Sequence, residues 1–290
     1  MTTLPGLTTS PGRFVDLQTH STASDGAAAP EALVRAARAA DLEAIALTDH
    51  DTIDGLDAAL AAGRAEGVRV VAGVELSAYD GDQEIHLLGL HVEPDAPLRQ
   101  MLATLRAARH ERAAEIVSRL NLLGVPVTLA AVLDAAAGGA IGRPHVARAL
   151  IDGGWARDRR DAFDRYLGVN GPAFVQKLRL SVADAIAIVH RAGGLSVLAH
   201  PGAQGTRAFI EPLVGLGLDG VEVLHPGHSR DDRDRLGALV DFFELVPSGG
   251  SDWHGATAGP RTLGRMKVPA SWLARQDERV VRMRAERRSA

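Results

Sequence analysis

The chain has 290 residues, of which 46% are hydrophobic and 23% are charged, so it can bury a large core and is not a disordered polymer. Its formal net charge of −4 supplies no overall positive field, and we therefore expect no duplex DNA among its partners. There is no cysteine, which excludes disulfides and thiolate metal ligands. Any bound metal must use histidine, carboxylate, carbonyl or water oxygen.

The sequence carries no signal for a membrane partner. Residues 1–13, MTTLPGLTTSPGR, lack the positive start and the apolar segment of a signal peptide. No later run approaches the roughly 18 apolar residues that a membrane span needs. We therefore expect a cytoplasmic protein, and nothing in the sequence indicates its oligomeric state.

Short apolar runs alternate with alanine-rich segments of helical period in the first part of the chain. Pro30 and Glu31 are typical of a helix start. This alternation predicts a parallel sheet covered by helices, either an open sheet or a barrel. The expected strands lie at 14–20, 44–47, 68–76 and 85–92, and the expected helices begin at 30 and span 53–66.

After Pro97 the alternation gives way to some 80 residues with helical patterns, which we interpret as an inserted helical subdomain. Strands and helices alternate again from residue 182. A last helix after Pro269 is rich in arginine but also contains acidic residues, so we expect a solvated surface helix rather than a nucleic-acid arm. The helices of the insertion are expected at 98–123, 129–137, 144–152 and 161–167, followed by helices at 182–192, 209–216 and 230–243 and strands at 195–199, 220–224 and 245–248.

Histidine and acidic residues gather where the predicted strands end. Ligands at the carboxyl ends of parallel strands converge on one mouth. Any one of them could be a cap or a turn residue, but eight together favour a cation cluster. Imidazole and carboxylate bind Zn²⁺, Mn²⁺ and Fe²⁺, and neighbouring carboxylates would repel one another without cations. The eight residues are His20, Asp25, His50, Glu75, His86, His200, Asp252 and His254.

Six segments in this order resemble the motifs of the PHP (polymerase and histidinol phosphatase) family: DLQTHSTASDG, ALTDHDTIDG, AGVELSA, EIHLLGLHV, VLAHPG and GSDWHG. The resemblance implies a distorted (β/α)7, TIM-like barrel and a site for two or three divalent ions, Mn²⁺, Fe²⁺ or Zn²⁺. Together with the pattern of helices and strands, it predicts a first barrel part (1–97), a helical insertion (98–178), a second barrel part (179–269) and a C-terminal helix (270–290). By position, one metal would use His20, Glu75 and Asp252, a second Glu75, His86 and His200, and a third Asp25, His50 and His254.

Gln18 departs from the resemblance, which implies a histidine at this position of the first motif. Glutamine offers a neutral carbonyl oxygen, a poorer partner for a transition metal than imidazole nitrogen. We therefore expect the metal at His20 to bind more weakly or with an extra water, in a site that is altered but working. The same departure leaves open a module that mainly binds metal or nucleotide.

Phosphate recognition is expected from Arg143, at a predicted helix start where backbone N–H groups favour an anion, with His145 beside it. The segment GRPHVARAL and the helical insertion resemble the PHP subgroup that acts on nucleoside 3′,5′-bisphosphates and on the 5′ ends of short RNA. The segment HPGHS, residues 225–229, resembles the phosphate-side loop of that subgroup. It leads us to expect substrate contacts from His228 and Ser229. Proton donation to the leaving oxygen would come from His228, preferred over His225, or from a metal-bound water.

The sequence therefore predicts a metal-dependent phosphoesterase acting on a small nucleotide-like phosphate monoester or short RNA through a metal-activated hydroxide. No G-x-S-x-G elbow and no P-loop motif occurs. A histidinol-phosphate-type phosphatase is the nearest alternative. An amidohydrolase with a carbamylated lysine is disfavoured, because neither Lys177 nor Lys267 lies at a predicted catalytic strand end.

Overall fold

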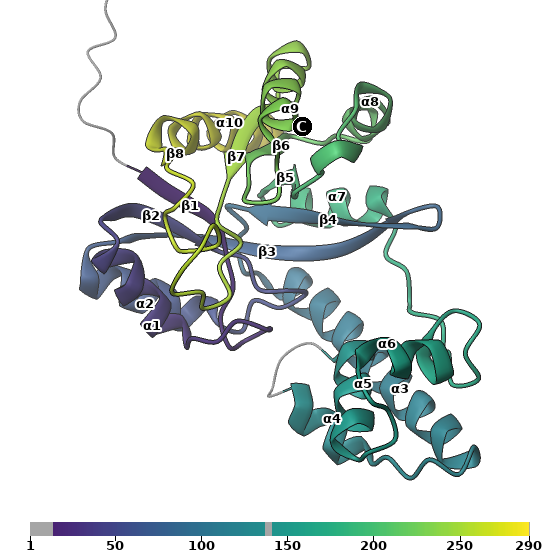
Figure 1. Cartoon of the computed structure of the whole chain (residues 1–290). Helices are drawn as coiled ribbons and strands as arrows, with labels where there is room; N and C mark the ends of the chain where they lie inside the picture. The colour runs from purple at the N-terminus through teal and green to yellow at the C-terminus, as the bar shows by residue number, and fades with distance from the viewer. Residues whose placement is uncertain (1–13, 137–140, 290) are drawn as a thin grey trace, which may run out of the picture.

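A computed structural model describes residues 14–136 and 141–289, in which one eight-stranded sheet curls into a nearly closed barrel (Figure 1). The strand order is β7-β6-β5-β4-β3-β2-β1-β8, and a bridge between Thr19 and Trp253 brings the end of β1 to the segment after β7. The predicted α/β barrel is confirmed. Its strands are β1 (Phe14–Thr19), β2 (Leu42–Leu47), β3 (Arg69–Asp80), β4 (Gln83–Leu90), β5 (Leu195–Leu198), β6 (Gly220–Leu224), β7 (Val246–Gly249) and β8 (Val268–Pro269).

The sheet is not parallel throughout, contrary to our expectation. Strand β4 runs antiparallel to both β3 and β5, and β8 runs antiparallel to β1. Only Gly81 and Asp82 separate β3 from β4, too few residues for the crossover that a parallel pair needs, and Gly81 makes the turn with φ +57°. Strand β3 therefore continues to Asp80, past its expected end at Leu76. The first half of β4, which carries His86, lies at the barrel mouth.

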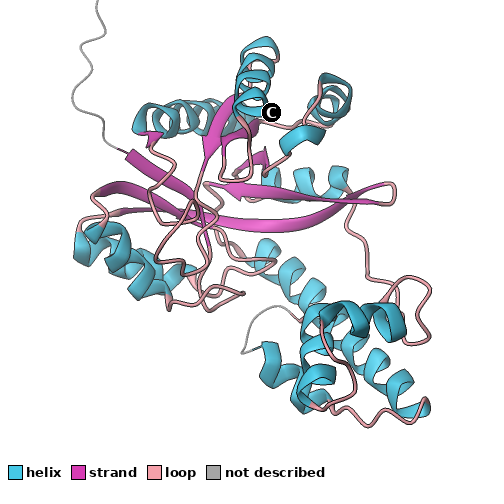
Figure 2. Ribbon diagram, viewed as in Figure 1, coloured by secondary structure: helices cyan, strands magenta, loops and turns pink. Residues whose placement is uncertain are grey.

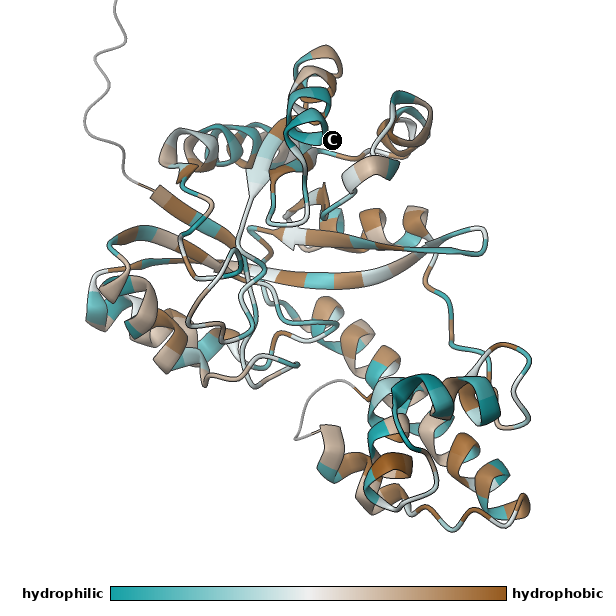
Figure 3. Cartoon of the chain, in the orientation of Figure 1, coloured by the Kyte–Doolittle hydropathy of each residue, from teal (hydrophilic) through white to brown (hydrophobic). Residues whose placement is uncertain are grey.

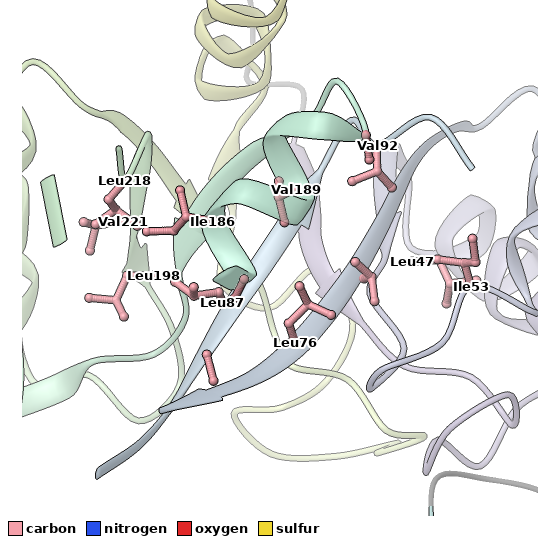
Figure 4. Packing of buried hydrophobic residues seen from close by; sticks show 14 of the residues in the cluster. Leu47, Ile53, Leu76, Leu87, Val92, Ile186, Val189, Leu198, Leu218 and Val221 are labelled. Carbon is pink, nitrogen blue, oxygen red and sulfur yellow. The ribbon is translucent and has the colours of Figure 1, made fainter. Parts of the chain in front are cut away.

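Helices cover the outside of the barrel with apolar stripes. In α7 the buried residues Val182, Ala185, Ile186 and Val189 follow the i, i+3, i+4, i+7 spacing of one helix face. Figure 4 shows Ile186 and Val189 packing over Leu76 and Leu87 of the β3–β4 hairpin. The covering elements are α1 (Pro30–Ala39), α2 (Leu56–Glu66), α7 (Val182–Arg191), the 3₁₀ turn η2 (Gly202–Gln204), α8 (Arg207–Gly215), α9 (Arg230–Phe242) and α10 (Ala270–Ser289).

Between β4 and α7 lies a helical lobe, residues 96–167, which Figures 1 and 2 show standing away from the sheet. Figure 3 shows hydrophobic and hydrophilic residues alternating along its long helix α3. The lobe has a hydrophobic cluster of its own, with Leu120, Leu150 and Tyr166 among its buried residues. Residue 137, where we expected a helix to end, lies outside the described residues. The lobe contains α3 (Ala96–Leu122), α4 (Leu129–Ala136), α5 (Arg143–Asp152), α6 (Arg159–Ala162) and the π-helical turn η1 (Phe163–Leu167).

The C-terminal helix α10 is more than a solvated surface helix. One face is buried through Leu273, Gln276 and Val280, and Arg69 of β3 makes two hydrogen bonds of 2.6 and 2.8 Å to Asp277. This helix therefore packs on the barrel along one side. Among the helices in the described part of the chain, none is both long and apolar enough to cross a membrane.

Replacement of Leu87 by alanine should lower the free energy of unfolding by about 2–5 kcal/mol, because the side chain is fully buried between β4 and α7 and leaves a cavity. The control is Leu122→Ala at a position that is 86% exposed, where a change within about 0.5 kcal/mol is expected. Urea unfolding followed by circular dichroism measures both. Equal midpoints for the two variants would contradict this packing.

Candidate metal centre and active site

The candidate metal ligands come from five places around the barrel mouth. His20 follows β1, His50 follows β2, Glu75 and His86 lie in the β3–β4 hairpin, His200 follows β5, and Asp252 and His254 follow β7. His200 and Asp252 have positive φ angles, 32° and 50°, in the left-handed region that non-glycine residues rarely adopt. Such strain concentrates where a site fixes a side chain.

Glu75 is at the centre of the site. Its Oε2 lies 3.1 Å from His20 Nε2 and 3.8 Å from His50 Nδ1, and its Oε1 lies 2.6 Å from His86 Nδ1 and 3.1 Å from His200 Nε2. The carboxyl group is completely buried, and burial opposes its ionisation. The four imidazoles outweigh burial and hold the pKa of Glu75 well below its usual range. One carboxylate is thus shared among four histidines.

Asp25 and Asp252 extend the cluster on two sides. Asp25 Oδ1 lies 3.2 Å from His254 Nε2, and Asp252 Oδ1 lies 3.3 Å from His20 Nε2. The rings of His20 and His254 stack with centroids 4.2 Å apart. The structure therefore brings all eight expected side chains together. Three groups have ligand atoms within 4.8 Å of one another: His20, Asp25, His50 and His254; His50, Glu75 and His86; and His20, Glu75 and Asp252.

The chemistry of these donors fits divalent cations. Both ring nitrogens of His20 and Nδ1 of His86 are buried, yet none has a hydrogen bond of proper geometry to the nearby carboxylate oxygens. Donor atoms that face a common point rather than one another are what a shared cation requires. The cluster also attracts positive charge. Burial opposes protonation of His20, but Asp252 and Glu75 outweigh it and raise the pKa to about 10.

Two buried aspartates hold the loops that carry these residues. Asp49 accepts hydrogen bonds from the backbone N–H and the hydroxyl of Ser21, both 2.7 Å, which fixes the turn leading to Asp25. Asp16 accepts from the N–H groups of Ser251 and Gly264 at 2.8 and 2.9 Å, which fixes the loop carrying Asp252. Burial raises the pKa of Asp16 to about 6 despite these bonds. Neither role was predicted from the sequence, because an aspartate inside a strand and an aspartate beside a histidine give no distinct signal.

Gln18 lies in the cluster, fully buried on β1. Its Nε2 donates a hydrogen bond of 3.1 Å to Glu75 Oε2, the oxygen that also faces His20. Its Oε1 is buried and has no hydrogen-bond partner within the described residues. The amide therefore contacts the shared carboxylate directly.

Arg143 and His145 lie at the start of α5 and face the same pocket as Asp25, His50 and His86. The guanidinium of Arg143 lies 5.5 Å from the ring of Phe163 and 5.4 Å from that of Phe174, and its Nη1 donates to Leu167 O at 3.1 Å. His145 Nδ1 accepts the N–H of Gly142 at 3.0 Å. Arg109, Arg112 and Lys177 line this pocket as well, which was not predicted from the sequence.

His228 and Ser229 do not face the cluster. His228 Nδ1 donates to Val223 O at 2.9 Å, and Nε2 accepts the N–H of Gly202 at 3.1 Å, so the backbone uses both ring nitrogens. Ser229 caps α9 by accepting the N–H of Asp232 at 3.1 Å. Both residues are therefore hydrogen-bonded to neighbouring backbone groups in this structure, and their expected substrate contacts stay predictions.

His225, which we ranked below His228, is the histidine of this loop that faces the cluster. Its Nδ1 accepts the N–H of Gly227 at 3.0 Å. Its Nε2 is buried without a hydrogen-bond partner in the described structure, 3.5 Å from Asp252 Oδ2. Burial lowers the pKa of His225 and favours the neutral ring.

An α/β barrel with a cluster of metal-ligand side chains at its mouth defines a metal-dependent hydrolase. The chain belongs to the PHP family: residues 16–171 match the family described as PHP domain. It is 36% identical over 245 residues to a 5′-3′ exoribonuclease of Haemophilus influenzae, covering 82% of this chain and 89% of the relative. It is also 36% identical over 261 residues to a 3′,5′-nucleoside bisphosphate phosphatase of Chromobacterium violaceum, covering 86% and 90%.

The fold is shared with a solved structure described as a metal-dependent phosphoesterase from Bifidobacterium adolescentis. The TM-score is 0.76 at 33% identity, with 92% of this chain and 96% of that chain covered. These similarities confirm the predicted family and barrel. The protein is a metal-dependent phosphoesterase of the PHP family, and its His, Asp and Glu groups provide candidate sites for divalent ions.

Glu75→Gln should lower metal affinity by more than about tenfold, since even the loss of a group that supports a metal ligand costs about 10–100-fold. Glu75 belongs to two of the three ligand groups. The matched control is Glu84→Gln, which lines the same pocket but pairs with Lys177 at 2.7 Å and belongs to no such group in the described structure. Mass spectrometry of the metal retained after desalting measures both. Full metal retention by Glu75→Gln would show that Glu75 is no ligand.

Proposed function

We propose that this protein hydrolyses a phosphate monoester of a nucleoside 3′,5′-bisphosphate, and that it also accepts the 5′ end of short RNA. The proposal is carried by one observation, a pocket of about 490 Å³ in which the acidic cluster meets a group of cations. This volume lies in the range of pockets for small ligands, roughly 300–1,000 Å³. Asp25, His50 and His86 line this pocket together with five positively charged side chains, Arg109, Arg112, Arg143, Arg159 and Lys177.

The cations of this pocket depress one another's pKa. Burial and then the charge of Arg112 lower the pKa of Arg109 to about 10, and burial and then Arg143 lower the pKa of Arg112. Lys177 is lowered by burial and by Arg109 in the same way. Within the described residues neither Arg112 nor Arg143 has a carboxylate in an ion pair. A phosphate dianion would relieve this repulsion.

The pocket contains both candidate metal ligands and positively charged side chains, and this combination suits a substrate with two phosphates. One phosphate would lie at the candidate metal ligands and the other at Arg112 and Arg143. The start of the ten-residue helix α5 faces the same space, so its backbone N–H groups and dipole favour the second anion. The named activities of the two relatives support this choice, because both concern nucleotide phosphates.

His225 would donate a hydrogen bond to the phosphoryl group. The N–H of Gly227 occupies Nδ1, so the neutral ring carries its proton on Nε2, the nitrogen that faces the cluster. Divalent cations at the site would acidify a water and neutralise phosphoryl oxygens. Arg143 would orient the second phosphate through its planar fork. His145 accepts a backbone N–H at Nδ1 and so presents Nε2–H to the pocket.

A substrate comparison tests the proposal. Metal-loaded protein should hydrolyse a nucleoside 3′,5′-bisphosphate with a kcat/KM at least about tenfold above that of the matching 5′-monophosphate, because one further charge-assisted hydrogen bond contributes about 1.5–3 kcal/mol. Phosphate release is the measurement, with histidinol phosphate as the alternative substrate. Equal turnover of the mono- and bisphosphate, or a preference for histidinol phosphate, would contradict the proposal.

Arg143→Met should remove that preference, with a loss of roughly tenfold to a hundredfold in kcat/KM for the bisphosphate alone. Methionine keeps an apolar stem between Phe163 and Phe174. The control is Arg160→Met on the same lobe, where the side chain is 91% exposed. If both variants lost activity toward mono- and bisphosphate equally, Arg143 would have no role in reading the second phosphate.

His225→Asn and His228→Asn separate the two histidines of the loop. Asparagine at 225 can still accept the N–H of Gly227 but has no Nε2–H, so kcat should fall by about tenfold to a hundredfold with metal content unchanged. His228→Asn should chiefly lower the melting temperature, because the Gly202 N–H loses its acceptor. The opposite pattern would restore His228 as the functional histidine. A parallel loss of metal in His225→Asn would show that His225 only orients Asp252.

A further inference from the structure

The three groups of candidate metal ligands differ in their balance of nitrogen and oxygen. The group at Asp25 has three imidazoles to one carboxylate. The group at Glu75 and His86 has two imidazoles, and His200 contacts the same carboxylate oxygen at 3.1 Å. The group of His20, Glu75 and Asp252 has one imidazole and two carboxylates. Imidazole suits Zn²⁺ and Fe²⁺, whereas carboxylate and carbonyl oxygens suit Mn²⁺ and Mg²⁺.

Gln18 contacts Glu75, a member of the oxygen-rich group, through its side-chain amide. An ionised carboxylate can only accept hydrogen bonds, so the amide must turn its NH₂ toward Glu75 Oε2, 3.1 Å away. The Oε1 and Nε2 atoms of Gln18 are bonded to the same carbon, so Oε1 also lies near Glu75. In the described structure Oε1 is fully buried and has no hydrogen-bond partner. A buried carbonyl oxygen without a donor is costly, and a cation would satisfy it.

We infer that Gln18 makes the position of His20, Glu75 and Asp252 selective, relative to the other two, for a harder cation such as Mn²⁺ or Mg²⁺. Nε2 holds the shared carboxylate, while Oε1 supplies a neutral oxygen ligand. The protein then carries a mixed set of metals, with Zn²⁺ or Fe²⁺ favoured where imidazoles dominate. This inference rests on the proposed function only in that both place cations at these residues.

A displacement titration tests the inference. Protein loaded with Mn²⁺ is titrated with Zn²⁺, and the Mn²⁺ retained is followed by electron paramagnetic resonance and mass spectrometry. Zn²⁺ binds most sites more tightly than Mn²⁺, so displacement is expected everywhere, but at different concentrations. We expect two phases, with the last Mn²⁺ per chain displaced at a roughly tenfold higher Zn²⁺ concentration. A single phase in the unaltered protein overturns the inference.

Three variants locate the effect at Gln18. Gln18→His supplies a second imidazole and should abolish the late phase, whereas Gln18→Glu keeps an oxygen donor and should retain it. Gln83→His places a histidine at the first residue of β4, outside the cluster, and should leave both phases unchanged. A late phase that persists in Gln18→His, or vanishes in Gln18→Glu with the fold intact by circular dichroism, contradicts the inference.

Phosphate release from a nucleoside bisphosphate is measured on the same samples, which separates the two proposals. Two-phase displacement without hydrolysis in any metal form would contradict the proposed function alone. Single-phase displacement with hydrolysis would contradict the role of Gln18 alone.

Discussion

The interaction on which the site depends is the burial of one carboxylate, Glu75, among four imidazoles. Moving a charge out of water costs several kcal/mol, so a buried carboxylate is tolerated only where opposite charge surrounds it. The imidazoles follow β1, β2 and β5 or lie in β4, segments that are far apart in sequence and meet only because the barrel is nearly closed. The fold thus brings these residues together, and the resulting cluster of imidazole and carboxylate groups can hold divalent cations.

A second layer of buried aspartates fixes the ligands in place. Asp16, Asp49 and Asp51 each accept backbone N–H groups from the loops that carry or contact the cluster. Charge-assisted bonds of this kind are stronger than neutral ones, and groups that orient metal ligands matter almost as much as the ligands. Asp16 holds the loop in which Asp252 adopts its positive φ, whereas the N–H of His200, which also has a positive φ, donates to Glu222 Oε2 at 2.7 Å. Hydrogen bonds of this kind fix the position of a ligand closely.

The clustering of the candidate ligands was predictable because strand ends and their chemistry are both local features of the sequence. The direction of β4 was missed, since alternating side chains read the same in either direction, and only the two-residue turn at Gly81 and Asp82 distinguishes a hairpin. Arg109 and Arg112 have the pattern of surface residues on a helix, and their place in the pocket depends on how the lobe meets the barrel. The choice between His225 and His228 required knowing which backbone groups occupy each ring nitrogen.

Asp51 connects the barrel and the helical lobe at the site. It directly follows His50, accepts the N–H of Ser77 at 3.1 Å on the barrel and forms an ion pair with Arg109 on α3 of the lobe. The loop that carries the candidate metal ligand His50 therefore also positions Arg109, one of the positively charged side chains that line the pocket. Arg106 strengthens the same junction through Asp54 at 2.7 Å. The barrel contributes carboxylates that need cations, and the lobe contributes guanidinium groups that need an anion. In the proposed function, a phosphate ester would lie between metals bound at the barrel and the arginines of the lobe, and it would satisfy both.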